Sequence, residues 1–371
     1  AATRLGVEPN TLTTRNGAVV DAKGSTIPYV ELAAAAAQIE PPKDPPLKPP
    51  AEWTILGKSQ PRFDMPGKCT GSTKYGIDVV LPGMLYATVK RNPRLGGKML
   101  GYDDSKALSM RGVERIIPME TGVIVVATNT WYAFQAAEQI EFDWGPAPYP
   151  DTTEGHRERV ELAFEGEPFD RPRDSGDVDT ALEDAHVIKG EYRVPYVAHA
   201  AMEPLNATAL LKDDRLDIWA GNQFPTLAVL IGARLTGLKK ESVRVHTPDM
   251  GGAFGRRFEM DDVEAAVRAA MAMPGTPVRV TYSREEDFSH DTYRPIAAAR
   301  FRASVANGKP KALDLHLSAP SLFFSGAVRR RELTGEPQQD VPDWDVSMAL
   351  GARNTPYEIE NYRVTTYRAT E

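Results

Sequence analysis

Positions 41–50 constrain the fold of this chain more than any other segment, because six of these ten residues are proline. Proline fixes the φ angle and has no amide hydrogen, so such a run forms neither a helix interior nor a central strand. Prolines at this density are typical of an extended linker. We therefore expect a boundary near residue 50, with a short unit before it and most of the chain after it.

The short unit carries two clear local patterns. The Asn16-Gly17 pair lies between β-type runs at 11–13 and 18–20. Both residues tolerate positive φ, so the pair predicts a hairpin turn. The segment 30–37 is rich in alanine and other helix formers and is closely followed by the prolines, so it predicts a helix.

The segment 58–150 predicts a domain in which strands and a helix alternate. Strand-like runs of apolar and β-branched residues lie at 75–80, 84–89 and 123–127. A helical pattern covers 130–139. Elements in this order are typical of an α+β fold.

A polar, acidic stretch at 151–179 predicts a separator, and a longer region of strands and helices follows it. The expected fold class is therefore α+β, with a mixed α/β domain in the second half of the chain. The strands expected there cover 185–194, 208–211, 216–219, 242–246, 278–282, 299–305 and 311–318, and the helices cover 226–236 and 259–273.

Composition argues against several classes of function. The formal net charge is −7 and the basic residues are scattered, which disfavours a nucleic-acid partner. The single cysteine, Cys69, allows no intramolecular disulfide and cannot supply the thiolates of an iron–sulfur cluster. No apolar run approaches the ~20 residues of a membrane span. The sequence starts without Met and stops directly after a strand-like run, so we expect a fragment of a longer protein.

Three glycines, at 251, 252 and 255, follow the predicted strand that ends at His246 and precede the predicted helix at 259–273. Such a turn presents backbone N–H groups and the positive end of a helix dipole, which suits an anion or an oxo group. The alternative is an ordinary turn that binds nothing. The spacing fits neither the phosphate loop nor the dinucleotide pattern, so a nucleotide-binding enzyme is disfavoured.

The charged residues that follow these glycines allow two interpretations. Arg256 and Arg257 come next in the chain, and guanidinium groups bind carboxylate or phosphate groups well. The alternative is an ion pair with a carboxylate of the same segment, at Glu259, Asp261 or Asp262.

Two further segments concentrate polar side chains. His199, Met202 and Glu203 lie close together after a predicted strand. A zinc site would need a second histidine, and Pro204 stops a helix there, so we expect these residues to line or brace a pocket. Gln223 lies in a tight turn before a predicted helix, where its side-chain N–H either donates to a ligand or stabilises the turn.

Five segments, taken in order, resemble the molybdopterin-binding large subunit of the xanthine dehydrogenase and aldehyde oxidase family. Their order and spacing carry the resemblance, which covers nearly the whole chain. The likeness is nearest to the bacterial branch of isoquinoline 1-oxidoreductase beta subunits and membrane-bound aldehyde dehydrogenases. The matching segments are residues 199–204, 219–225, 251–257, 283–287 and 353–357.

The resemblance implies three regions along the chain. Residues 1–50 are then the tail of a preceding cofactor-binding segment together with the proline-rich linker. Residues 51–150 are then an a/b hammerhead domain. Residues 151–371 are then the first part of a molybdenum-cofactor-binding domain that is incomplete at its C-terminal end.

The resemblance also implies a hydroxylase that oxidises an aldehyde or an N-heteroaromatic compound with oxygen from water. The cofactor is then a molybdenum–pterin group, by likeness to bacterial relatives in its cytosine dinucleotide form. Electrons pass to a two-iron two-sulfur small subunit, with a cytochrome c as a further candidate acceptor, and no iron–sulfur cluster is expected on this chain. The expected location is periplasmic or membrane-associated in a bacterium, and otherwise cytoplasmic. The alternative is a non-catalytic fragment or scaffold domain that binds no cofactor on its own.

Site residues follow from the resemblance position by position. Phe258 stands where purine-oxidising members place a glutamate, which disfavours a purine substrate. The family's general base is a glutamate near the C-terminus of the full subunit, and Gly166-Glu167-Pro168 and Gly335-Glu336-Pro337 stand at the wrong place in the motif order, so we expect the base outside this chain. The cofactor contacts are then Gln223, Gly251, Gly252, Ala253, Phe254, Gly255 and Arg256, and the substrate pocket is His199, Met202, Glu203 and Phe258.

Overall fold

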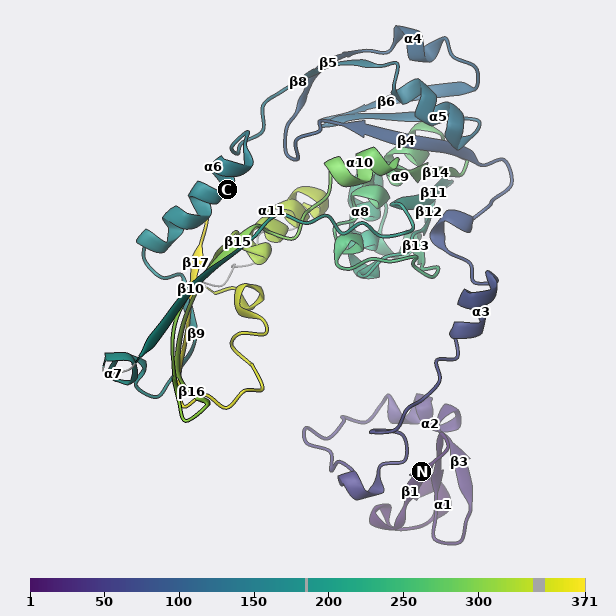
Figure 1. The fold of residues 1–371 in the computed structure, drawn as a ribbon. Coiled ribbons are helices and arrows are strands. Elements are labelled where there is room, and N and C mark those ends of the chain that lie inside the picture. The colour runs from purple at the N-terminus through teal and green to yellow at the C-terminus, as the bar shows by residue number, and fades with distance from the viewer. Residues whose placement is uncertain (184–185, 336–343, 371) are drawn as a thin grey trace. The chain divides into compact units, whose positions relative to one another are not determined.

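The computed structural model describes residues 1–183, 186–335 and 344–370. The chain forms two compact units, Ala1–Cys69 and Thr70–Glu371, which are described separately below (Figure 1). The division between the units therefore follows the proline-rich segment along the chain. The three regions expected from the resemblance stay a prediction.

The first unit is built on a three-stranded antiparallel sheet in the order β1-β2-β3. Asn16 and Gly17 have φ angles of 50° and 75° and join β1 to β2, so the predicted hairpin is confirmed. The predicted helix at 30–37 is also present, as α2 (Tyr29–Ala36). The other elements are α1 (Ala2–Leu5), β1 (Thr13–Arg15), β2 (Ala18–Val20), β3 (Thr26–Pro28) and α3 (Met65–Thr70).

A seven-stranded mixed sheet forms the centre of the second unit, in the order β13-β12-β11-β14-β4-β7-β6 (Figure 1). Its strand β14 pairs in parallel with β4, so Val278 lies opposite Leu85. Strands from both sides of the predicted separator thus share one sheet. The strands are β4 (Leu85–Arg91), β6 (Val113–Met119), β7 (Gly122–Ala127), β11 (Asn206–Lys212), β12 (Arg215–Trp219), β13 (Val243–His246) and β14 (Val278–Thr281).

The main hydrophobic core lies between this sheet and two helices, α8 (Pro225–Thr236) and α9 (Asp261–Ala272). Helix α9 packs on β11 and β14 through a face of small residues, including Ala265 and Ala269. Small side chains let the helix lie close to the sheet. The first turn of α9 is acidic, which matches the positive end of the helix dipole.

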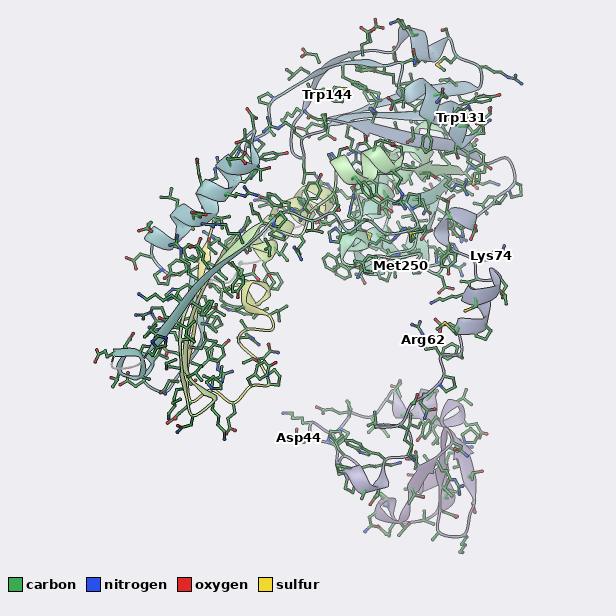
Figure 2. The ribbon with its side chains drawn as sticks, in the orientation of Figure 1. Asp44, Arg62, Lys74, Trp131, Trp144 and Met250 are labelled. Atoms are coloured by element: carbon green, nitrogen blue, oxygen red, sulfur yellow. The ribbon has the colours of Figure 1, made fainter. Side chains whose placement is uncertain are left out.

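Strand β7 is buried on both faces, which explains its unbroken apolar sequence. Ile124 and Val126 belong to the main core, whereas Val123 and Val125 point into a second cluster with α5 (Thr130–Ala137). A two-stranded sheet that carries Trp144 flanks this cluster (Figure 2). Phe142 stacks on Trp144 there, with ring centroids 4.3 Å apart. The remaining elements here are α4 (Ser105–Leu108), β5 (Met99–Asp103) and β8 (Glu141–Trp144).

A five-stranded sheet, in the order β10-β15-β16-β17-β9, forms the other part of the second unit. The predicted separator at 151–179 is wrong, because this stretch forms helix α6 and the edge strand β9. Its polar side chains fit an edge position, where one side of the strand faces solvent. The elements are α6 (Thr153–Leu162), β9 (Asp170–Ser175), α7 (Val178–Glu183), β10 (Val187–Val194), β15 (Ala297–Ala306), β16 (Lys309–Ala319), α11 (Leu322–Thr334) and β17 (Asn361–Arg368).

The expected mixed α/β character is confirmed, with one clear error in an element. The predicted strand at 75–80 is a 3-10 turn at Gly76–Asp78, because Asp78 accepts a hydrogen bond from the backbone N–H of Tyr75. A Cβ at Gly76 would lie 2.7 Å from Oδ1 of Asn206, so this turn fits closely against β11. In the part of the chain that the structure describes, no helix is long and apolar enough to cross a membrane.

Candidate functional site

The glycine loop, residues 251–255, connects β13 to the start of α9 and has a backbone that few other residues would adopt. Gly252 and Gly255 have φ angles of 112° and 108°, in the left-handed region that favours glycine. A Cβ at Gly251 would lie 2.4 Å from Cβ of Glu203, closer than any two such carbons approach. The glycines therefore serve both the turn and its close contact with the 199–204 segment.

Three consecutive N–H groups of this loop have no acceptor within the described part of the chain. Gly251 donates its N–H to Oε2 of Glu203 at 2.7 Å, and Gly255 donates to Oε1 of Gln223 at 3.2 Å. Between these two bonds, the N–H groups of Gly252, Ala253 and Phe254 find no acceptor among the residues that the structure describes. A run of unpaired backbone donors is suited to an anion or an oxo group.

Gln223 lies beside these donors, at the turn that opens α8. Its backbone N–H donates to the carbonyl of Arg257 at 3.1 Å, and its exposed side chain reaches Gly255. Because the side-chain oxygen accepts from Gly255, the amide NH2 group is left to donate elsewhere. The neighbouring Asn222 fixes the turn by accepting a hydrogen bond from the N–H of Phe224 at 3.1 Å. The structure thus brings together the two segments that the sequence assigned to one site.

Arg257 ties the loop to its surroundings. Its side chain is 1% exposed and donates to three backbone carbonyls within 3.3 Å, those of Gly252, Glu203 and Pro204. Its Nη2 also lies 3.0 Å from Oε2 of Glu203, in a buried ion pair. Sequence reasoning gave this arginine no such role, although carbonyls freed by a glycine turn need a donor of this kind.

Glu203 neutralises the buried charge of Arg257. Its Oε1 accepts hydrogen bonds from the N–H of Ile77 and from Nδ2 of Asn206, both at 3.0 Å. Its Oε2 accepts from Gly251 and Arg257. Both carboxylate oxygens are therefore engaged by the protein, and Glu203 holds the loop in place. The direct substrate contact expected of Glu203 stays a prediction.

Arg256 forms the ion pair that the sequence left as an alternative. Its two Nη atoms lie 2.6 and 2.9 Å from the oxygens of Asp261, and Arg91 approaches the same carboxylate at 3.2 Å. Burial opposes the charged form of Asp261, but the two guanidinium groups outweigh it and hold its pKa far below the usual range. The pKa of Arg256 is raised by the same pairing, against the effect of its burial. The guanidinium of Arg256 therefore faces the protein.

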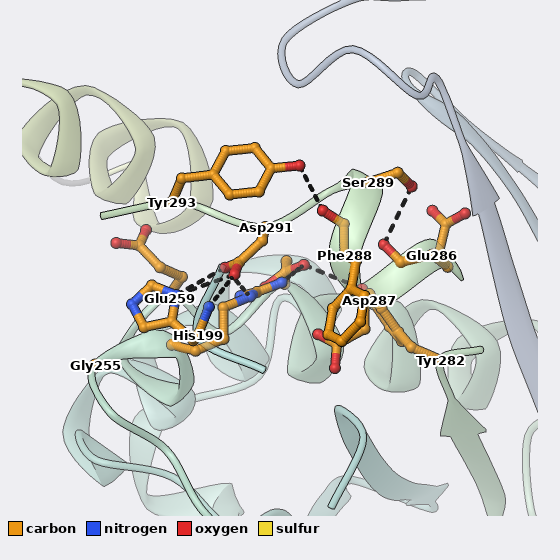
Figure 3. Close-up of polar contacts among 12 residues, drawn as sticks. His199, Gly255, Glu259, Tyr282, Glu286, Asp287, Phe288, Ser289, Asp291 and Tyr293 are labelled. Atoms are coloured by element: carbon orange, nitrogen blue, oxygen red, sulfur yellow. Dashed lines mark hydrogen bonds and ion pairs between the residues drawn. The ribbon is translucent and has the colours of Figure 1, made fainter. Parts of the chain in front are cut away.

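His199 continues this chain of charges toward the loop (Figure 3). Its Nδ1 lies 2.9 Å from Oδ1 of Asp291, and its backbone N–H donates to Oδ2 of the same carboxylate at 2.7 Å. Asp291 in turn lies 3.1 Å from Nε of Arg256, as an ion pair. The other ring nitrogen of His199 faces Gly255, because a Cβ added there would lie 3.5 Å from Nε2.

Two exposed apolar side chains lie on the segments that form the site. Phe254, in the loop itself, is 74% exposed, and Met202, in the 199–204 segment, is 85% exposed. Phe258 stacks on Phe224 with ring centroids 5.1 Å apart and is only partly exposed. The loop therefore offers hydrogen-bond donors next to apolar surface, an arrangement that suits a group with both polar and flat apolar parts.

Comparison with known proteins identifies the domain that carries the glycine loop. Residues 164–330 match the family model of the molybdopterin cofactor-binding domain, a range that contains the whole glycine loop. Curated relatives include molybdenum-binding subunits of xanthine dehydrogenase. Residues 164–330 therefore carry a molybdopterin cofactor-binding domain, and the chain resembles the molybdenum-binding large subunits of the xanthine dehydrogenase and aldehyde oxidase family.

Members of this family similar to the chain include several bacterial oxidoreductases. It is 30% identical over 98% of its length to a nicotinate dehydrogenase of Pseudomonas putida, and it covers 31% of that protein. It is 29% identical over 80% of its length to an isoquinoline 1-oxidoreductase of Brevundimonas diminuta, in that enzyme's beta chain, of which it covers 39%. A membrane-bound aldehyde dehydrogenase (pyrroloquinoline-quinone) of Gluconacetobacter polyoxogenes is 29% identical over 98% of the chain, which covers 49% of it. The chain thus spans between a third and a half of these relatives.

Solved structures of two bacterial oxidoreductases share its fold. Aldehyde oxidoreductase from Desulfovibrio gigas aligns with a TM-score of 0.63 and 20% identity, over 87% of this chain and 39% of that one. Quinoline 2-oxidoreductase from Pseudomonas putida 86 aligns with a TM-score of 0.56 and 21% identity, over 70% of this chain and 39% of that one. The resemblance inferred from the five motifs and the expected fold class are both confirmed.

The segment 283–287, which follows strand β14, opens a short helix, α10 (Arg284–Ser289). Ser283 caps this helix by accepting a hydrogen bond from the N–H of Glu286. Arg284 donates to the carbonyls of Ala201 at 2.7 Å and Met202 at 2.5 Å, so the helix supports the segment that carries His199.

Glu286 is a buried carboxyl group that sequence reasoning missed. Its Oε1 accepts a hydrogen bond from the N–H of Arg91 at 3.0 Å. Burial raises its pKa to about 7, against the opposing charge of Arg91. Burial also raises the pKa of Asp262 to about 6 and lowers that of His290 to about 4. All three of these groups are buried.

The remaining sequence assignments lie away from the loop or outside the described chain. Glu167 is exposed in the turn before β9, and Glu336 and Pro337 lie outside the described residues. Within the described ranges, no three His, Cys, Asp or Glu side chains gather as a metal site. The individual cofactor and substrate contacts stay predictions.

Proposed function

We propose that this chain is the cofactor-binding part of a molybdenum hydroxylase that oxidises an aldehyde or an N-heteroaromatic compound with oxygen from water. The observation that carries the proposal is the run of free N–H groups at 252–254, flanked by the amide of Gln223. The names of relatives support the substrate class, since they include nicotinate dehydrogenase, isoquinoline 1-oxidoreductase and aldehyde oxidase.

The residues present fit a molybdenum–pterin group. The N–H groups of Gly252, Ala253 and Phe254 and the NH2 group of Gln223 would hold its oxygen atoms. The carboxylate that accepts from the loop, that of Glu203, is neutralised by its pairing with Arg257. When bound, the group supplies a Lewis acid and takes up the two electrons of the oxidation. The proposal places it on the exposed face of the loop.

This chain would contribute preorganised donors and an apolar wall. Backbone N–H groups fixed by the glycine turn stabilise negative charge without reorganising, which is the usual source of a large rate effect. Phe254 and Met202, both exposed, would pack against a flat ring and exclude water from it. The buried pair Glu203–Arg257 would keep these donors in position.

Electron transfer would require a second chain. This chain carries one cysteine, which is exposed, so the ligands of an iron–sulfur cluster must come from elsewhere. We infer a two-iron two-sulfur small subunit as that partner, with a cytochrome c as a further acceptor. By likeness to bacterial relatives, the pterin would carry a cytosine nucleotide.

The proposal is tested by metal and pterin analysis of the full natural subunit, produced together with its small subunit. We expect stoichiometric molybdenum and pterin, and turnover of isoquinoline, nicotinate or benzaldehyde with an artificial electron acceptor. The variant Gln223→Ala should lose cofactor, whereas Gln139→Ala, at an exposed position elsewhere, should not. Protein that contains neither molybdenum nor pterin would instead support a non-catalytic scaffold.

A further inference from the structure

One ring nitrogen at the edge of the glycine loop has no role in the fold. Nδ1 of His199 is committed to Asp291. Nε2 of the same ring has no partner among the residues that the structure describes. The side chain is 16% exposed, so this nitrogen is not sealed in the core. It lies against Gly255, where an added Cβ would lie 3.5 Å from it (Figure 3).

Asp291 fixes the protonation pattern of this ring. A carboxylate only accepts hydrogen bonds, so Nδ1 of His199 must carry the proton that it shares with Asp291. In the neutral ring Nε2 is then an acceptor. Asp291 cannot turn away easily, since it also accepts from the backbone N–H of His199 and pairs with Arg256.

The arginine that pairs with Asp291 is itself held by further charged and polar groups. Arg256 is held by Asp261, and Asp261 by Arg91 and the hydroxyl of Tyr282, so alternating charges run from the core to the imidazole. A group anchored in this way loses little side-chain entropy when it binds a ligand. The arrangement is that of a positioned acceptor, held at the side of a loop that otherwise offers donors.

We propose that Nε2 of His199 accepts a hydrogen bond from the group bound over the glycine loop, and that Asp291 is the positioning residue that makes it an acceptor. The inference rests on the proposed function. It adds an acceptor to a site whose other polar groups are donors, so the bound group must present an N–H or O–H toward Gly255. A pterin ring carries such N–H groups.

Chemical labelling tests this contact directly. Diethyl pyrocarbonate acylates accessible neutral imidazole nitrogens, and the modified histidines of the full-length protein are identified by mass spectrometry. We expect His199 to be labelled in cofactor-free protein and to react several-fold more slowly in the holoenzyme. His186, which is exposed, should react equally in both forms, and His290, which is 6% exposed, in neither. Equal labelling of His199 in both forms overturns the proposal.

Two variants of His199 distinguish the roles of its two ring nitrogens. His199→Asn keeps an N–H donor for Asp291 and removes the group at the Nε2 position, whereas His199→Gln places an amide oxygen near that position. One lost hydrogen bond should speed cofactor dissociation about 3- to 10-fold in His199→Asn. His199→Gln should stay close to wild type. If His199→Asn retains cofactor like wild type, or both variants lose it equally, the ring only supports the fold and the proposal is wrong.

The results of these experiments distinguish a failure of this inference from a failure of the proposed function. Wild-type protein that holds no molybdenum or pterin contradicts both. Wild-type protein that holds them while His199 stays unprotected contradicts only the role of His199.

Discussion

Arg257 and Glu203 form a buried ion pair, 3.0 Å from Nη2 to Oε2, that joins segments 54 residues apart in the sequence. The same carboxylate accepts from the N–H of Gly251, and the same guanidinium donates to the carbonyl of Gly252. The pair therefore fixes the loop at its start, just before the three free N–H groups.

Removing one member of this pair should destabilise the fold strongly. Glu203→Gln leaves the guanidinium of Arg257 charged and buried without its counter-ion, which costs about 3–5 kcal/mol of the free energy of unfolding. Denaturant unfolding of the two proteins measures this loss. The control is Glu120→Gln, which breaks an exposed pair with Lys98 and should change stability by about 1 kcal/mol or less. Equal effects of the two changes would contradict the role given to Glu203.

A methyl group at position 251 should disturb the loop. Gly251→Ala places its Cβ 2.4 Å from Cβ of Glu203, so the backbone must move, at a cost of about 1–3 kcal/mol. Gly166→Ala is the matched control, because its Cβ would meet the nearest atom at an ordinary 3.5 Å. Thermal unfolding and cofactor content should both fall for Gly251→Ala alone. Unchanged values for this variant would mean that the close contact is absent in solution.

The stability of the protein should depend on pH through Glu286. Its pKa is raised by burial to about 7 from 4.5, so the folded protein keeps a proton that the unfolded chain releases. The free energy of unfolding therefore decreases as pH rises through this range, by up to about 3 kcal/mol from this group.

The variant Glu286→Gln isolates that contribution. Asp262 acts in the same direction and His290 in the opposite one, and both remain in the variant. Subtracting the unfolding free energies of wild type and variant, measured between pH 4.5 and pH 7, should leave a difference that shrinks as pH rises. A difference independent of pH would show that Glu286 titrates normally.

A negative charge on the side chain at position 223 should lower the molybdenum content more than a reduction in the size of that side chain does. Gln223→Glu replaces the free NH2 donor by a carboxylate next to the loop, so it should lower molybdenum content further than Gln223→Ala does. Gln139→Glu makes the same change at an exposed site and should leave the metal content unaltered. Equal metal content in all three variants would exclude Gln223 from the site.

Local patterns predicted much of the fold, because they depend on residues close in the sequence. The hairpin at Asn16-Gly17 follows from backbone preference, and the buried strand β7 from an unbroken apolar run. The separator expected at 151–179 was wrong because the structure of this stretch depends on residues far away in the sequence. Strand β9 is recognisable only through its pairing with β17, which comes nearly two hundred residues later.

The site, too, was predicted only in part. Gly251 and Gln223 could be assigned to one site because motif order brings distant segments together. The partner of Arg256 was among the alternatives, because Asp261 is a near neighbour in sequence. The partner of Arg257 could not be assigned, because Glu203 lies 54 residues earlier in the chain. A buried arginine and an exposed one look alike until the acceptors around them are known.

A crystal structure of the holoenzyme tests the central claim most directly. The account predicts electron density for the molybdenum–pterin group against the glycine loop. At least one of its oxygen atoms should lie within hydrogen-bond distance of the N–H groups of Gly252, Ala253 or Phe254, with the amide of Gln223 beside it. A group bound elsewhere, with these N–H groups facing only water, would contradict the account.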